Sequence, residues 1–202
     1  MEKLLNSYNE KKFAENTVCG ARQVLDHFLK DLPDRHAHSL RVYQNVGMFM
    51  DTITMHPDKK KSILLAALLH DIGYSPDLRS SGFHPFDGYI YLHENGWDFE
   101  VTSLVLGHSF ARELSATQSP ELYHIYYQKE KFLDTELLTI LSLADFTAGP
   151  TGNLVTLSDR VNDIVNRYGE ESPISKHALL AKRSLRNINI TSELLTRFNL
   201  SY

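Results

Sequence analysis

The sequence has a single cysteine, Cys19, among its 202 residues, so no disulfide can form within the chain. This cysteine usage is typical of a reducing compartment, and we expect a cytoplasmic location. Long apolar runs are also lacking, since the longest is the seven-residue run Ile63–Leu69. A membrane-spanning helix needs about 20 apolar residues, so we expect no membrane insertion. The first six residues lack the apolar core of a signal peptide.

An excess of positive charge is missing as well. The formal net charge of −4 argues against a protein that coats nucleic acid, so we expect no stable nucleic-acid partner. A composition of 42% hydrophobic and 23% charged residues is that of a folded globular protein and excludes intrinsic disorder. The length predicts one domain over residues 1–202, with a core at about 17–150 and a C-terminal helical extension at 153–202.

Apolar residues recur at intervals of three and four along nearly the whole chain, which predicts an all-α fold, a single helical bundle with additional C-terminal helices. We expect Asn16 to cap a first helix that stops at Pro33, and a second helix to begin near His38. Gly73 is expected to stop the third helix. Residues 109–131 lack a clean period and predict a loop with one short helix at most, which could also form a lid. The remaining helices are predicted near 57–71, 85–95, 98–108, 134–145, 155–168 and 173–198.

Several of the predicted helices have an apolar face, and a polar side chain that could bind a metal lies at the end of that face. Burying an ionised carboxylate costs several kcal/mol without a compensating cation, and a helix C-terminus repels negative charge. A satisfied core histidine or a capping aspartate would explain any one of these residues. A bound metal explains all of them together. The candidate ligands are His38, His70, Asp71, His84, His108 and Asp145.

The order of these residues resembles the H…HD…D signature of the HD superfamily of metal-dependent phosphohydrolases, which have an all-helical fold. The local strings that carry the resemblance are His38-Ser-Leu-Arg-Val, Ala66-Ala-Leu-Leu-His-Asp-Ile-Gly and Leu143-Ala-Asp. The resemblance covers about residues 33–150. It implies that the four common ligands are His38, His70, Asp71 and Asp145. It further implies that His84 and His108 hold a second metal, with Asp71 as a bridge.

This ligand set implies one or two divalent transition-metal ions, chosen among Fe, Mn, Co, Ni and Zn. Four neutral imidazoles and two carboxylates carry a charge of −2, so two divalent ions would leave the pocket positive and favour a phosphoester. We therefore predict hydrolysis of a small phosphoester, such as a nucleotide or related metabolite, by attack of metal-bound hydroxide. The catalytic candidates are Asp71, His70 and Arg112, and the substrate-binding candidates are Arg112, Arg79, Arg35 and Tyr74. Tyr74 and Trp97 could stack on a base, although core packing or a surface role is the preferred interpretation of both.

Two other functions remain open. The same ligand order resembles that of inositol oxygenase, a di-iron oxygenase whose relatives hold the substrate with a nearby lysine. No lysine occurs between Lys61 and Lys129, which weighs against an oxygenase. A regulatory module with a purely structural metal is the other alternative, but no ligand is missing. The last two predicted helices are amphipathic and could pack on the domain or form a homodimer contact.

Overall fold

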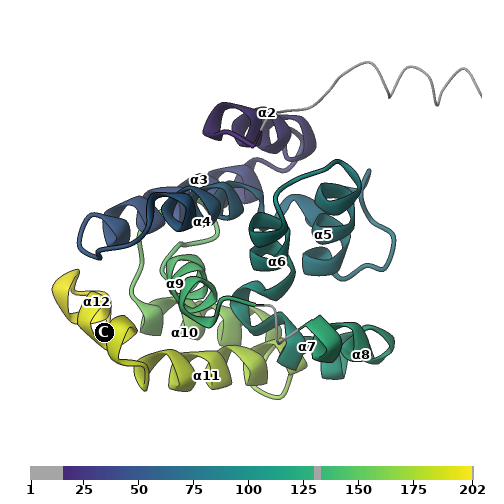
Figure 1. Ribbon diagram of the computed structural model, residues 1–202. Helices are drawn as coiled ribbons and strands as arrows, with labels where there is room; N and C mark the ends of the chain where they lie inside the picture. The colour runs from purple at the N-terminus through teal and green to yellow at the C-terminus, as the bar shows by residue number, and fades with distance from the viewer. Residues whose placement is uncertain (1–15, 130–132, 202) are drawn as a thin grey trace, which may run out of the picture.

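The computed structural model describes residues 16–129 and 133–201, and within them the predicted all-α fold is confirmed (Figure 1). The β-structure of this part of the chain is limited to one isolated antiparallel bridge between Ala148 and Leu154. The helices are α2 (Val18–Phe28), α3 (Pro33–Met50), α4 (Pro57–Leu69), α5 (His84–Glu94), α6 (Phe99–Gly107), α7 (Ala111–Gln118), α8 (Pro120–Lys129), α9 (Thr135–Phe146), α10 (Leu157–Tyr168), α11 (Pro173–Arg186) and α12 (Asn189–Arg197). Two short 3-10 turns, η1 (Ile72–Tyr74) and η2 (His108–Phe110), follow α4 and α6.

Helix α4 is the central element of the N-terminal half. It contacts α2, α3, α6 and α9, and its residues are buried around most of its circumference. The run Ile63–Leu69 has no polar side, and a helix that is apolar all round is stable only when it is enclosed. Pro57 occupies the first turn, and the His56 imidazole accepts a hydrogen bond from the Asp58 amide. His70 and Asp71 directly follow this buried helix and therefore lie in the interior of the protein.

The C-terminal helices share the core of the preceding ones. Helix α10 contacts α9 and α11, α12 contacts α9 and α11, and α11 also contacts α7. The buried core extends continuously from Ala21 in α2 to Leu200 after α12. Figure 1 shows α10 and α11 crossing below α9, so these helices close the lower side of the bundle.

The N-terminal helix boundaries differ from those predicted. The side chain of Thr17, not that of Asn16, caps α2, because Thr17 Oγ1 accepts the amide of Gly20. Asn16 instead accepts the amide of Asp98, the residue that precedes α6. Pro33 begins α3 rather than stopping the helix before it, because a proline at the first helical position has no amide that the helix needs. Helix α3 therefore starts five residues before His38.

The prediction that residues 109–131 form a loop with at most one short helix was wrong. Helices α7 and α8 occupy most of this stretch and contact each other, with Ser115 and Tyr126 buried. Tertiary packing stabilises these helices although their apolar period is weak. The single helix predicted at 173–198 is also wrong, since the chain breaks between Arg186 and Asn189 into α11 and α12. The other predicted helices, including α4, α5, α6, α9 and α10, are confirmed to within a few residues.

Gly73 does not act as a left-handed helix stop. It lies within the 3-10 turn η1 and is absent from the positive-φ glycines of the described chain. Its role is close packing, because a Cβ atom there would lie 2.0 Å from the backbone oxygen of His84 and 2.6 Å from the amide nitrogen of Gly88. The missing side chain thus lets η1 rest directly on the first turns of α5.

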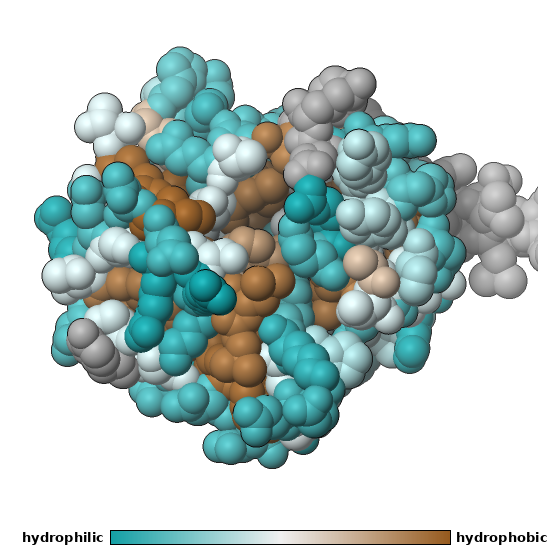
Figure 2. Space-filling model, turned by 90° about the horizontal axis from the view of Figure 1, so that it is seen from below, coloured by the Kyte–Doolittle hydropathy of each residue, from teal (hydrophilic) through white to brown (hydrophobic). Residues whose placement is uncertain are grey.

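The outer surface carries some apolar side chains between hydrophilic ones. Figure 2 shows them gathered along the middle of the lower face of the molecule. Leu179 and Leu180 of α11 are 44% and 49% exposed, respectively. The homodimer contact expected of the C-terminal helices stays a prediction. None of the helices in the described ranges combines the length and hydrophobicity that a bilayer crossing requires.

Candidate metal centre

The six predicted ligands come together although they belong to separate helices. His38 lies within α3, His70 and Asp71 follow α4, and His84 opens α5. The other two lie at the end of α6 and near the end of α9. Three overlapping groups have ligand atoms within 4.8 Å of one another: His38, His70 and Asp71; His70, His108 and Asp145; and Asp71, His84 and His108.

Asp71 is the neighbour that the histidines share. Its Oδ1 lies 3.5 Å from His70 Nε2, 3.4 Å from His84 Nε2 and 4.0 Å from His108 Nε2. Its Oδ2 lies 3.8 Å from His38 Nε2. Two atoms that each bind one ion at about 2.1 Å are at most about 4.2 Å apart, so these separations suit coordination. Asp71 lies between two groups of imidazoles, which is the position of a bridging carboxylate.

Backbone carbonyls determine which nitrogen of the histidines faces the cluster. Three histidines have Nδ1 within hydrogen-bond distance of a carbonyl oxygen: His70 with Ala67 (2.9 Å), His108 with Val105 (2.7 Å) and His38 with Gly149 (3.1 Å). A carbonyl only accepts, so Nδ1 carries the proton and Nε2 presents its lone pair to the cluster. His70 Nε2 is buried and has no hydrogen-bond partner within the described residues. An orphaned lone pair of this kind fits a metal ion.

The electrostatics of the cluster also favour metal binding. Burial opposes ionisation of Asp71, but the nearby His70 and Arg35 hold its pKa well below the usual range. Burial opposes ionisation of Asp145 as well, but the adjoining His38, with Nε2 2.8 Å from Asp145 Oδ1, and the nearby His70 hold its pKa well below the usual range. Burial, followed by the neighbouring His70, lowers the pKa of His108 to about 4. The carboxylates are therefore ionised and His108 is neutral at pH 7, as metal ligands must be.

A stack of three side chains borders the cluster. Arg35 NH1 donates to Asp71 Oδ2 at 3.1 Å, and its guanidinium carbon lies 4.1 Å from the centre of the Tyr74 ring. On its other face, Tyr74 stacks on His84 with 4.0 Å between ring centres and an interplanar angle of 18°. The stack fixes the His84 ring. It also places Arg35 and Tyr74, two of the predicted substrate-binding residues, at the site.

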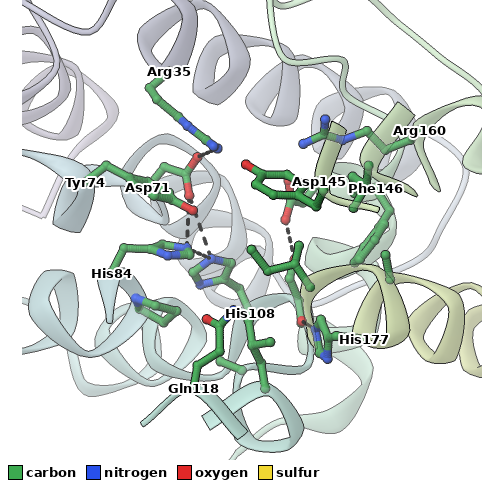
Figure 3. A pocket seen from close by; sticks show the side chains of 18 of the residues that line it. Arg35, Asp71, Tyr74, His84, His108, Gln118, Asp145, Phe146, Arg160 and His177 are labelled. Carbon is green, nitrogen blue, oxygen red and sulfur yellow. Dashed lines mark hydrogen bonds and ion pairs between the residues drawn. The ribbon is translucent and has the colours of Figure 1, made fainter. Parts of the chain in front are cut away.

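A cavity of about 150 Å³ opens beside the cluster. Arg35, Asp71 and His84 border it on one side, and Arg160 and His177 face them from α10 and α11 (Figure 3). Side chains from α7 contribute a further wall, so the first half of the stretch 109–131 does border the site. The cavity is thus enclosed between the N-terminal helices and the C-terminal extension.

Three other candidates do not lie in this cavity. Arg112 borders a neighbouring pocket and pairs with Glu113 at 2.5 Å. Its predicted role depended on its place in the sequence, four residues after His108, but Ser109 and Phe110 have φ angles of 51° and 60° and redirect the chain. Arg79 is exposed on the far side of His84. Trp97 is buried in the core at 5% exposure, which confirms the preferred interpretation.

Comparison with known proteins is consistent with this geometry. The family model described as HD domain matches residues 35–148, more than half of the chain. The chain belongs to the HD domain family. An uncharacterized Mycoplasma pneumoniae protein, the MG461 homolog, is 33% identical over 78 residues, which is 35% of this chain but only 17% of that protein. No solved structure matches. The HD domain indicates the superfamily of metal-dependent phosphohydrolases, and the histidine–aspartate cluster indicates a divalent metal.

Three residues at the site were missed by sequence reasoning. Ser109 Oγ donates a short hydrogen bond to Asp145, and the Ser109 carbonyl accepts from His177 Nε2 at 2.8 Å. Arg160 and His177 lie beyond the residues that match the HD domain. A signal for Arg160 existed, because it falls on the same apolar face of α10 as Leu157 and Ile164. The polar sequence around His177 predicts a surface position, whereas the side chain is half-buried.

Proposed function

We propose that this protein hydrolyses a small phosphoester, a nucleotide or related phosphorylated metabolite, with the help of one or two divalent transition-metal ions. The observation that carries the proposal is the orientation of His38, His70 and His108. Their Nδ1 atoms bond to backbone carbonyls, and their Nε2 atoms converge on the two aspartates. Histidine ligands of metal sites are commonly held in this way, with the ring N–H that does not face the metal bonded to a carbonyl.

The donor set would hold the ions in two adjoining groups. His38, His70 and Asp145 would form one group, and His84 and His108 the other, with Asp71 between them. Nitrogen and oxygen donors without sulfur suit Fe, Mn, Co, Ni or Zn. A divalent ion bound here would lower the pKa of a coordinated water toward about 7 and neutralise charge on the phosphoryl oxygens.

The protein's own residues orient the reactants. Asp71 Oδ1 lies 3.4 Å from His84 Nε2 and 3.5 Å from His70 Nε2, so this carboxylate holds and orients the attacking water. The water oxygen bonds to phosphorus as the ester P–O bond breaks, and a water proton passes to the leaving oxygen. The products are an alcohol and inorganic phosphate from a monoester, or an alcohol and a phosphomonoester from a diester. Arg35, which is 31% exposed and hydrogen-bonded to Asp71, binds the phosphoryl oxygens.

The cations around the cavity favour this reaction over the oxygenase alternative. Related oxygenases hold their substrate with a lysine. The cationic side chains that line the described part of the cavity are the arginines Arg35, Arg160 and Arg167. A guanidinium group matches the geometry of phosphoryl oxygens and binds them through two parallel hydrogen bonds. The proposal therefore names a phosphoester as substrate.

The test combines elemental analysis with a substrate panel under anaerobic conditions. We expect one to two transition-metal ions per chain and release of phosphate or nucleoside from at least one phosphoester. Asp71→Ala should lose both metal and turnover, because Asp71 contacts both groups of donors. Asp77→Ala, a change at an exposed aspartate nearby, should keep both. Full metal occupancy in Asp71→Ala would contradict the site, and turnover that requires oxygen would favour the oxygenase.

A further inference from the structure

Arg160 is a buried cation that makes few hydrogen bonds to the described residues. It is 9% exposed, and its guanidinium points into the cavity from the side opposite Arg35 (Figure 3). Within the described residues, its side chain makes one hydrogen bond, from NH1 to Asp163 Oδ2 at 3.5 Å. The same oxygen accepts a much shorter bond, 2.6 Å, from Arg167. Most of the five N–H donors of Arg160 therefore remain free for a ligand.

The buried charge of Arg160 is also poorly compensated. Burial lowers the pKa of Arg160 from its usual value, but an arginine does not lose its proton in proteins. Asp145 attracts the guanidinium, yet this carboxylate already accepts a hydrogen bond from Ser109, lies 2.8 Å from His38 Nε2 and is a candidate metal ligand. A desolvated cation whose one paired carboxylate, Asp163, is shared with Arg167 is destabilising, and an anion bound in the cavity would offset that cost.

The charge of the whole site indicates which anion fits. Two divalent ions on four imidazoles and two carboxylates leave an excess of two positive charges, and Arg35 and Arg160 add two more, whereas the charge of Arg167 is paired with Asp163 at 2.6 Å. A phosphomonoester carries a charge of about −1.5 to −2 at pH 7, whereas a phosphodiester carries one negative charge. The extra arginine therefore discriminates in favour of the monoester, whose third non-bridging oxygen can accept hydrogen bonds from a guanidinium.

From these contacts, we propose that Arg160 binds the phosphoryl group of the substrate and makes this site selective for phosphomonoester dianions over phosphodiesters. The inference rests on the proposed phosphohydrolase function and assigns its substrate class. Arg160 belongs to α10, beyond the residues 35–148 that match the HD domain. The C-terminal helices thus supply a specificity residue to the metal site of the preceding domain.

The experiment uses two probes that differ by one negative charge. At a pH above its second pKa, where the titrations are run, phenylphosphonate is a dianionic, non-hydrolysable analogue of a phosphomonoester, and its monomethyl ester is the monoanionic counterpart. Their dissociation constants are measured by titration calorimetry on metal-loaded protein, with metal content and thermal unfolding recorded for each variant. The variants are Arg160→Gln, which removes the charge, and Arg160→Lys, which keeps it. Arg183→Gln, at an exposed arginine of α11, is the matched control.

We expect wild type to bind phenylphosphonate at least about 10-fold more tightly than the ester, since a charged hydrogen bond contributes that much. Arg160→Gln should weaken phenylphosphonate binding by about 10- to 100-fold and ester binding by less than about 3-fold. Arg160→Lys should retain most of the selectivity, and Arg183→Gln should match wild type. With a chromogenic monoester and diester, kcat/KM should follow the same order.

The outcomes separate the two proposals. Unchanged selectivity in a folded, metal-loaded Arg160→Gln variant overturns the role of Arg160. If that variant does not fold, wild-type protein that binds both probes equally tightly overturns it as well. Metal-loaded wild type that binds neither probe and cleaves no phosphoester overturns the proposed function itself.

Discussion

Gly73→Ala should disturb the metal centre without changing a ligand. The added Cβ would lie 2.0 Å from the His84 backbone oxygen, whereas an ordinary contact begins at 3.4 Å. The turn η1 and helix α5 must therefore separate by about 1.4 Å. Metal–ligand distances tolerate only about 0.2 Å, so His84 would leave its coordination distance. Because Gly73 contacts backbone atoms, no flexible side chain can relieve the overlap.

We expect Gly73→Ala to lower the free energy of unfolding by about 1–3 kcal/mol, the usual range for an overpacked site. Elemental analysis should show about one metal ion fewer per chain than in wild type, because His84 and His108 would no longer bind an ion together. The His38, His70 and Asp145 side of the cluster should keep its ion.

Gly47→Ala is the matched control, because a Cβ at Gly47 meets nothing within 4 Å. Gly47 lies in the interior of α3, where alanine should stabilise the helix by about 0.5–1 kcal/mol. Metal content in this variant should equal that of wild type. Gly73→Ala protein with unchanged metal stoichiometry and stability would refute the argument that direct backbone packing positions His84.

Two further predictions concern the helix α9, which carries Asp145. Asp134 caps α9 through Oδ1 and pairs with Lys59 through Oδ2 at 2.6 Å. Asp134→Ala should therefore lower the free energy of unfolding by about 1 kcal/mol, whereas Asp134→Asn should keep most of the cap. Burial raises the pKa of Asp134, but the hydrogen bond from Lys59 outweighs burial and lowers the pKa overall. The ionised Asp134 therefore stabilises the folded protein above the pKa of an unfolded aspartate, and this stabilisation is lost in acid. Measuring the free energy of unfolding from pH 7 to pH 2 would show the loss. A pH dependence in Asp134→Asn that equals that of wild type would contradict this. Asn45 Nδ2 donates to the Ala144 carbonyl at 3.1 Å, so Asn45→Ala should lower the free energy of unfolding, measured by chemical denaturation, by about 1–3 kcal/mol. Gln44→Ala, at an exposed neighbouring position, should change it by less than about 0.5 kcal/mol. Equal stabilities of the two variants would contradict a stabilising role of this hydrogen bond.

Most of the ligand positions could be predicted from local pattern, because they lie on or at the end of an apolar helix face that must face the core, whereas His84 only precedes Pro85 at the start of α5. The run Ile63–Leu69 forces α4 inside, and whatever follows it must be inside as well. His70 and Asp71 follow it, which is why both were identified. The helix boundaries near prolines were less certain, because a proline can either stop one helix or begin the next, as Pro33 does.

The failure at Arg112 has a definite cause. Arg112 was chosen because it lies four residues after His108 in the sequence, but the positive φ angles of Ser109 and Phe110 redirect the chain between the two residues. Nothing in the residue types announces this change, since left-handed backbone is most common at glycine and asparagine. The same two residues place the Ser109 hydroxyl on Asp145 and its carbonyl on His177.

The sequence by itself determined the all-α class, the helix faces that point inward and the polar residues at the ends of those faces. Helical periodicity and burial are local consequences of side-chain polarity. The tertiary structure decided which arginine faces the cavity and which histidine nitrogen faces the cluster. These depend on contacts between residues far apart in the chain, such as Gly149 with His38, and on how α10 packs beside α9. No local pattern specifies such contacts, since they arise only when the helices pack around a common core.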